Sequence, residues 1–226
     1  GRHAPLKRWL LAVCALAALA PAAPCLELGG GVRGGGGGSL LYGGWVDDLH
    51  GELEGLGAAT VSDRVYLSWR GGGWIEVPVP DVLTFRVEAD VGPVGGSLLA
   101  SDGYDMLVGI TGIEAALQVL AVHRIRIPFG EVTLGSGVFV GAAFTVRETR
   151  TDGTTRTEGE LADVLTRIGL ACGAGYAVPI GPGAITLDLR VLTGLFSFAD
   201  PWLPSAIKSV SVELAAGWEF RPRGAR

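Results

Sequence analysis

The feature that most constrains the fold of this chain is the strict alternation of apolar residues with polar or very small ones. It is clearest in VSVELAAGWEF (210–220). An extended strand with this period has one apolar face and one polar face. The apolar parity comprises Val210, Val212, Leu214, Ala216, Trp218 and Phe220, and the other comprises Ser211, Glu213, Ala215, Gly217 and Glu219. An inward apolar face predicts a soluble β protein, whereas an outward one requires surrounding lipid.

The N-terminal residues carry a different pattern. Lys7 and Arg8 precede an apolar run (9–20) and several small residues, which is typical of a secretory signal peptide. The run is shorter than the roughly 20 residues that a membrane-spanning helix needs. We therefore predict a signal peptide over 1–22 and a β-barrel domain over 23–226.

Composition excludes several classes of function. The net charge is −5 and no basic stripe is present, which argues against nucleic acid as a partner. The three cysteines and three histidines are few and scattered, so we expect no disulfide framework, no metal site and no cofactor. No long apolar run follows the signal peptide, so any membrane association must use strands.

Eight alternating runs predict eight strands. They lie near 26–36, 65–77, 82–94, 109–127, 131–146, 163–178, 184–196 and 208–220. Three connections, 78–81, 128–130 and 179–183, are short and rich in Pro and Gly, as in tight turns. The other connections are longer, at about 37–64, 95–108, 147–161 and 197–207. This asymmetry is typical of outer-membrane barrels, whose short turns are periplasmic.

The charges indicate which face is inside. One parity of the strands is apolar and uncharged. The other parity carries Arg70, Glu76, Arg86, Glu88, Asp90, Glu114, Arg124, Arg126, Arg167, Asp188, Arg190, Glu213 and Glu219. Glycines lie between these charges, which suits a cramped barrel interior better than a wet surface. We predict an all-β fold, an eight-stranded antiparallel up-and-down transmembrane β-barrel. A soluble sandwich with one wet face is the alternative.

Two longer stretches carry a family resemblance. IEAALQVLAVHRIRIPFGEVTLGSGVFVGAAF (113–144) and LTRIGLACGAGYAVPIGPGAITLDLRVLTGLFSF (165–198), with VSVELAAGWEF, resemble outer-membrane β-barrel proteins of the PorT-like type. The likeness covers the last half of the chain well and the first half loosely. It implies an eight-stranded barrel in the bacterial outer membrane, whose terminal aromatic strand is read by the outer-membrane assembly machinery. Trp218 and Phe220 match that assembly signal.

The predicted lumen charges form the one polar constellation in the sequence. Side chains fill the interior of an eight-stranded barrel, and buried charges are normally paired. We interpret the charges as a structural network, with an ion path or gate as the alternative. The network comprises Arg70, Arg86, Glu88, Asp90, Glu114, Arg124, Arg126, Arg167, Asp188, Arg190 and Glu213.

No catalytic constellation is apparent. His123 has lipid-facing parity and lies near the short turns, on the wrong side for acyl chemistry at the outer leaflet. His50 lies in an acidic loop, and such a loop is more commonly solvated than part of a metal site.

We therefore expect a monomeric, non-enzymatic outer-membrane barrel with a structural role or a binding role in its outer loops. Its expected partners are outer-membrane lipid and the assembly machinery, and the ligand of the loops is not identified. Two alternatives are a narrow channel and a periplasmic lipocalin-like barrel that holds a hydrophobic ligand.

Overall fold

The computed structural model describes residues 28–79, 83–101, 106–199, 203–204 and 207–220. The predicted signal peptide lies outside these residues. The described residues form one helix, α2 (Gly44–Gly55), and a set of strands. The strands are β1 (Gly29–Tyr42), β2 (Thr60–Arg64), β3 (Tyr66–Val79), β4 (Leu83–Ser101), β5 (Met106–Ile127), β6 (Gly130–Asp152), β7 (Thr155–Ile180), β8 (Gly183–Ala199), β9 (Leu203–Pro204) and β10 (Lys208–Phe220).

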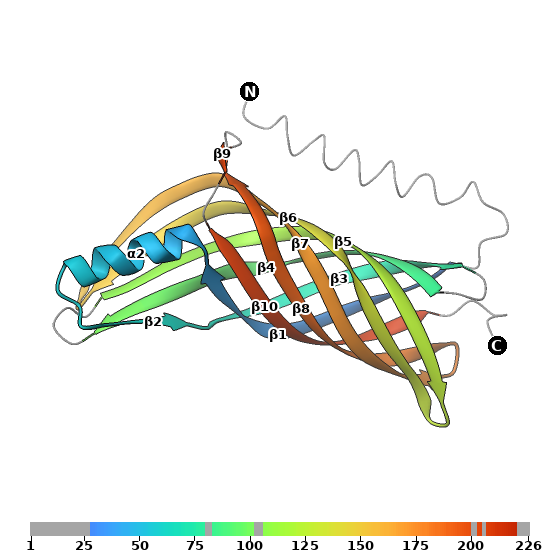
Figure 1. Ribbon diagram of the computed structural model, residues 1–226. Coiled ribbons are helices and arrows are strands. Elements are labelled where there is room, and N and C mark those ends of the chain that lie inside the picture. Colours follow the sequence, from blue (N-terminus) through green and yellow to red (C-terminus); the bar gives the residue numbers. More distant parts are fainter. Residues whose placement is uncertain (1–27, 80–82, 102–105, 200–202, 205–206, 221–226) are drawn as a thin grey trace.

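Eight of these strands close into a ring (Figure 1). The order is β1, β3, β4, β5, β6, β7, β8 and β10, and each strand is antiparallel to the next. β10 then pairs with β1, from Gly30 opposite Phe220 to Tyr42 opposite Lys208. The predicted eight-stranded antiparallel up-and-down barrel is therefore confirmed as the fold.

Tight turns join the strands at one end, which we call the turn end. Residues 128–129 connect β5 to β6, and residues 181–182 connect β7 to β8. Gly181 has a φ of 58°, a conformation that glycine adopts without steric cost. These two turns lie where the sequence predicted them, and most of the third lies outside the described residues.

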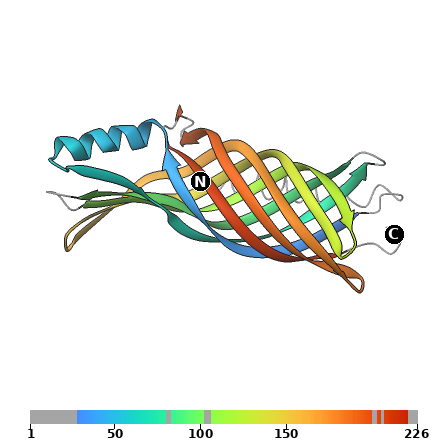
Figure 2. The ribbon, with the colours of Figure 1, turned by 60° about the horizontal axis from the view of Figure 1, so that its bottom comes forward.

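The opposite end, which we call the extension end, differs from the predicted long loops. Residues 95–101 and 106–108 continue β4 and β5, and residues 147–152 and 155–161 continue β6 and β7. β1, β8 and β10 stop earlier, so β2, β4, β5, β6 and β7 project beyond the ring as an extension sheet (Figure 2). The prediction of loops was wrong because the β6–β7 part of this sheet is polar on both faces and lacks the alternation of a half-buried strand.

Three register shifts lie toward the extension end, two at the border between the ring and the extension sheet and one between β7 and β8 within the ring. They lie between Thr111 and Ile113, between Val146 and Arg147, and between Ile168 and Gly169. An inserted residue reverses the face that later side chains take. In β6 the buried parity changes between Ala143 and Val146. Thr145, between them, has a φ of 55°, which is rare for a β-branched residue.

The outer face of the ring is apolar on every strand. Each strand exposes large hydrophobic side chains, for example Val32, Trp69, Phe85, Leu117, Val138, Leu170, Leu187 and Leu214. In β10, Leu214 and Phe220 are 54% and 59% exposed, whereas Glu213 and Glu219 are buried. The polar face of β10 is therefore the inner one, as predicted, and the alternative of a soluble sandwich is wrong.

Candidate functional site

Most of the interior falls into two zones of opposite chemistry, and a smaller apolar cluster lies beside the charged one on the walls of β5 to β8. Toward the turn end lies a set of charged and polar side chains, which we call the charged lumen. It comprises Arg33, Arg70, Glu76, Arg86, Glu88, Asp90, Glu114, Gln118, Arg124, Glu131, Arg167, Asp188, Arg190, Glu213 and Glu219. Toward the extension end lies the apolar cap, formed by Leu41, Val46, Leu49, Leu53, Ala58, Leu98, Ala100, Met106, Val108, Ile110, Ala143, Val146, Ala162, Leu165 and Ile207.

Arg70 on β3 joins three other strands at the centre of the charged lumen. Its two terminal nitrogens lie 2.6 Å from Asp90 Oδ1 and 3.0 Å from Glu114 Oε2, and its Nε lies 3.0 Å from Glu213 Oε1. All four side chains are buried. Asp90 also accepts a hydrogen bond from Arg33 at 3.1 Å. One guanidinium thus ties together four walls of the barrel.

Glu88 on β4 is a second junction, and it collects three arginines. Its carboxylate lies 2.7 Å from Arg33, 3.4 Å from Arg86 and within hydrogen-bonding distance of Arg190. Arg86 also lies over the ring of Trp74, with 5.1 Å between the guanidinium carbon and the ring centroid, a cation–π geometry. Glu88 is fully buried, so its charge depends on these arginines rather than on water.

The same chemistry continues to both limits of the charged lumen. At its border with the apolar cap, Arg167 pairs with Glu114 and donates a hydrogen bond to Ser209. Near the turn end, Arg124 is half-buried and contacts three carboxylates. They are those of Glu76 at 2.5 Å, Glu131 at 3.1 Å and Glu219 at 3.1 Å.

The structure places every predicted lumen residue in the interior except Arg126. The Arg126 side chain lies 3.5 Å from Glu131 and is 73% exposed. It is exposed because β5 ends at the next residue, Ile127, where the turn begins. Asp188 is buried, but among the described residues it makes no ion pair within 4.0 Å, and its Oδ2 has no hydrogen-bond partner. The prediction did not identify any pairing.

Three members of the charged lumen were missed by sequence reasoning: Arg33, Gln118 and Glu131, the last of which lies beside the turn at the start of β6. Arg33 precedes a run of glycines, 34–38. A run of glycines has no alternation of hydropathy, so it does not indicate which side of the strand faces inward. Gln118 lies between Leu117 and Val119 on the inward parity of β5, and it donates a hydrogen bond to Asp90 at 2.6 Å. The regular alternation of the apolar residues around Gln118 places it on the inward parity, so the sequence did contain a signal for this residue.

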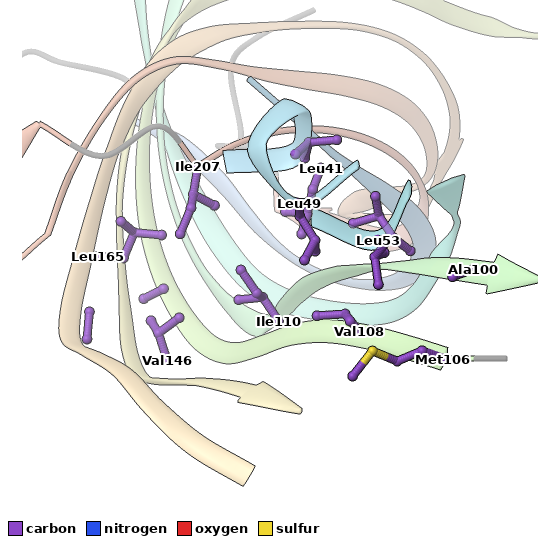
Figure 3. Packing of buried hydrophobic residues seen from close by; sticks show 14 of the residues in the cluster. Leu41, Leu49, Leu53, Ala100, Met106, Val108, Ile110, Val146, Leu165 and Ile207 are labelled. Atoms are coloured by element: carbon purple, nitrogen blue, oxygen red, sulfur yellow. The ribbon is translucent and has the colours of Figure 1, made fainter. Parts of the chain in front are cut away.

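Helix α2 closes the extension end. Val46, Leu49 and Leu53 lie on one face of the helix and are buried, at the spacing of an amphipathic helix. Leu49 and Leu53 point toward the wall residues of the apolar cap, including Val108 and Ile110 (Figure 3). Full burial of one such leucine contributes roughly 1.5–3 kcal/mol. The helix is therefore held by the inner face of the extension sheet.

One ion pair holds α2 at its surface, and a histidine of the helix lies near an aspartate of β2. Arg150 of β6 lies 2.7 Å from Glu52 Oε1, and His50 Nε2 lies 3.6 Å from Asp63 Oδ1 of β2. Hydrogen bonds to Glu52 and Glu148 raise the pKa of Arg150 above its ordinary value, so this guanidinium stays charged. The contacts reach β2 and β6, on either side of β4 and β5.

The two interior cavities beside Asp188 and beside Arg167 are small. Each has a volume of about 20 Å³, which is space for about one water molecule. A hollow of about 540 Å³ lies on the outward face instead, where His123 and Ser136 line it. The interior zones are therefore packed with side chains at both of these points.

The described part of the chain assembles no metal centre. His123 and Cys172 are exposed on the outward face, and His50 Nε2 lies 3.6 Å from Asp63 Oδ1. No group of three or more His, Cys, Asp or Glu side chains in this part could hold a metal ion. Within the same residues, no helix has the length and hydropathy required to cross a membrane.

No protein-family model matches the chain, and no curated protein matches it. Among solved structures it is similar to Ail, the attachment invasion locus protein of Yersinia pestis, at 11% identity and a TM-score of 0.41, over 86% of this chain and 99% of that one. It is similar to Neisserial surface protein A at 13% identity and a TM-score of 0.38, over 85% and 96%. It is also similar to OprG from Pseudomonas aeruginosa, at 12% identity and a TM-score of 0.41, over 86% and 94%.

At these identities the likeness concerns the fold alone. The class itself is defined by the pairings within this chain. It is a closed eight-stranded antiparallel barrel with an apolar outer face, a charged lumen and a helical cap.

Proposed function

We propose that this chain is an integral outer-membrane barrel that does not conduct, and that it serves as a rigid anchor for the extension sheet and its helical cap. One observation carries the proposal: the closed ring has its charged side chains inside and its apolar side chains outside. Charges such as Glu88 and Glu114 are fully buried inside, while leucines such as Leu187 and Leu189 are about half exposed outside.

The apolar outer face supports a lipid environment. Soluble monomers rarely expose contiguous apolar patches larger than a few hundred Å², whereas this ring exposes large hydrophobic side chains on all eight of its strands. A closed barrel also satisfies its backbone hydrogen bonds without water. A lipocalin-like barrel would carry its apolar face inward and its charges outward, the reverse of this arrangement.

The filled interior supports the absence of a pore. Glu88 on β4 pairs with Arg190 on β8, on the opposite side of the charged lumen. Arg70 and Arg167 each connect strands that lie two places apart in the ring, and α2 covers the apolar cap. An ion that entered would have to displace paired charges and then apolar side chains. The alternative of a narrow channel would need both zones to rearrange.

The long strands support an anchoring role. A membrane-spanning strand needs about 9–11 residues, and β5, β6 and β7 have 22, 23 and 26. The surplus lies at the extension end, where the β6–β7 hairpin is polar. Any binding role then belongs to a projecting sheet rather than to loops, and we expect no enzymatic activity.

The turn end fits the predicted assembly signal. Trp218 and Phe220 lie on the outer side of β10, with 6.4 Å between their ring centroids in an edge-to-face arrangement. Aromatic side chains at this level suit a membrane interface. Recognition by the outer-membrane assembly machinery is part of the proposal.

Two measurements on one preparation test the proposed function. Purified protein is refolded into phospholipid vesicles, and flotation and planar-bilayer conductance are both recorded. We expect the protein to float with lipid after an alkaline wash and to show no stable conductance. Protein left in the wash would contradict membrane insertion, and steady porin-sized currents would contradict the sealed interior.

A further inference from the structure

The extension sheet has an open edge on β7. This strand pairs with β6 from Thr155 to Ala177, but its pairing with β8 begins only at Leu165. Among the residues that the structure describes, which omit 200–202 and 205–206, no strand pairs with the other side of 155–159. An open edge presents backbone N–H and C=O groups that can pair with another strand.

The same segment is uncovered on its faces. Every residue from Thr155 to Leu161 is exposed, whatever its parity. Further along β7, residues 165, 167, 169 and 171 are buried in alternation, as in an ordinary barrel wall. The opposite edge of the extension sheet is β2, which has only five residues and touches α2. β7 therefore offers the more accessible edge.

The hairpin turn determines which backbone groups face the open side. Residues 153–154 form a two-residue turn, in which Gly153 has a φ of 53°. The residues that flank such a turn exchange hydrogen bonds, as do alternate residues beyond them. Thr155 and Thr157 therefore bond to β6. The backbone groups of Arg156 and Glu158 point to the open side.

The charges on this edge are complementary to themselves. Arg156 and Glu158 flank Thr157, and their side chains lie 2.5 Å apart within one chain. In an antiparallel pair of two copies with Thr157 opposite Thr157, each Arg156 lies opposite the other copy's Glu158. Opposite charges and paired threonines are favourable cross-strand neighbours. The charge pairs also fall on the two residues whose backbone groups are available.

We propose that residues 155–159 of β7 are a homotypic docking site, which pairs antiparallel with the same edge of a second copy in a register centred on Thr157. This inference rests on the proposed membrane orientation. The two-fold axis of such a pair is perpendicular to the sheet, and the normal of a barrel wall is parallel to the membrane plane. The two barrels therefore point in opposite directions and lie in facing membranes.

The pairing of two β7 edges of this length is weak, but each membrane carries many copies of the protein. Linked binding events raise the effective concentration of later ones. The site therefore joins two facing bilayers that both carry this protein. Two copies in one membrane have the same orientation and cannot form the antiparallel pair.

The first test captures the register. In a variant without native cysteines, Thr157→Cys is placed in phospholipid vesicles, which are mixed and mildly oxidised. We expect an intermolecular disulfide, because opposed residues of a non-hydrogen-bonded pair lie close together. Thr155→Cys is the matched control and should not cross-link, since its opposite residue is Gly159. Equal cross-linking at both positions, or none at Thr157→Cys, overturns the register.

The second test exchanges charges on the exposed edge and measures vesicle clustering by light scattering. Wild-type vesicles should cluster. Arg156→Glu and Glu158→Arg should each lose clustering alone, because like charges then oppose each other. Vesicles of the two variants should cluster when mixed, and the double variant should cluster by itself. Dispersed wild-type vesicles, or undiminished clustering of either single variant, overturn the proposal.

Flotation of the same samples separates the two proposals. Protein that floats with lipid but neither clusters nor cross-links leaves the membrane barrel intact and rejects the docking site. Protein that does not float rejects the proposed function, whatever the clustering shows.

Discussion

The charged lumen and the apolar cap fill one continuous tube by opposite means. In the lumen, side chains from the ring strands pair across the interior, as Arg70 does with Asp90, Glu114 and Glu213. In the cap, a helix from a connection between strands supplies Leu49 and Leu53 to an apolar wall. The ring alone completes the lumen, whereas the cap needs a separate segment. We therefore expect damage to the lumen to affect the whole barrel and damage to the cap to stay local.

The largest effect should come from breaking the centre of the charged lumen. Arg70→Met removes three ion pairs and leaves Glu213 without its arginine partner. Loss of one partner of a buried pair costs about 3–5 kcal/mol. We expect a fall of that size in the free energy of unfolding, measured with urea in vesicles.

Arg126→Met is the matched control for Arg70→Met. The Arg126 side chain is mostly exposed, and surface substitutions usually change stability by less than about 0.5 kcal/mol. Equal losses in the two variants would contradict a distinct role for the interior charges.

An arginine introduced on the outer face of the ring should destabilise the barrel, whereas the native arginines of the charged lumen stabilise it. Leu214 follows Glu213 on β10 but faces outward. Leu214→Arg should destabilise the barrel by roughly 2–4 kcal/mol if it lies near the bilayer midplane, and Phe220→Arg, near the interface, by only about 0–1 kcal/mol. Urea unfolding in vesicles measures both. A harmless Leu214→Arg would place this face outside the hydrocarbon core.

A cavity in the apolar cap should have a more confined effect. Leu53 is fully buried, and a buried leucine replaced by alanine costs about 2–5 kcal/mol. We expect the lower part of this range, because α2 can shift, and we expect the loss as faster amide exchange in α2 with an unchanged barrel. Leu56→Ala, at a position 54% exposed, is the control. Faster exchange throughout the ring would show that the two zones are coupled.

The smallest effect should come from the surface contact of the cap. Glu52→Gln weakens the pair with Arg150, which is partly exposed on both sides. Exposed pairs contribute roughly 0.2–1 kcal/mol and are screened by salt. Proteolysis of α2 should accelerate slightly in Glu52→Gln at low salt and match the wild-type rate at 1 M salt. A difference that persists in high salt would contradict an electrostatic origin.

The difference between the zones also explains what could be predicted from the sequence. The ring strands and the inward side of Asp90 or Arg190 follow from period-two alternation, because lipid and lumen impose opposite chemistry on the two faces. Pairings such as Arg70 with Glu213 depend on closure of the ring, which brings β3 and β10 to either side of β1. Local pattern contains no such information.

The apolar cap was missed for a different reason. Val46, Leu49 and Leu53 have helical spacing within the connection 37–64, so the signal for α2 was present but short. Its burial depends on the extension sheet, whose β6–β7 hairpin is polar on both faces. Without alternation in that hairpin, there was no predicted surface for the helix to cover.

The central claim is that the apolar face of a closed ring faces lipid while its charged face is enclosed. The most direct test places one spin-labelled cysteine at each position from 209 to 220 in a variant without native cysteines and measures collision with oxygen dissolved in the bilayer. We predict frequent collisions at even positions such as 212 and 214 and few at odd positions such as 211 and 213. The opposite phase, or a profile without lipid contact at any position, would contradict the account.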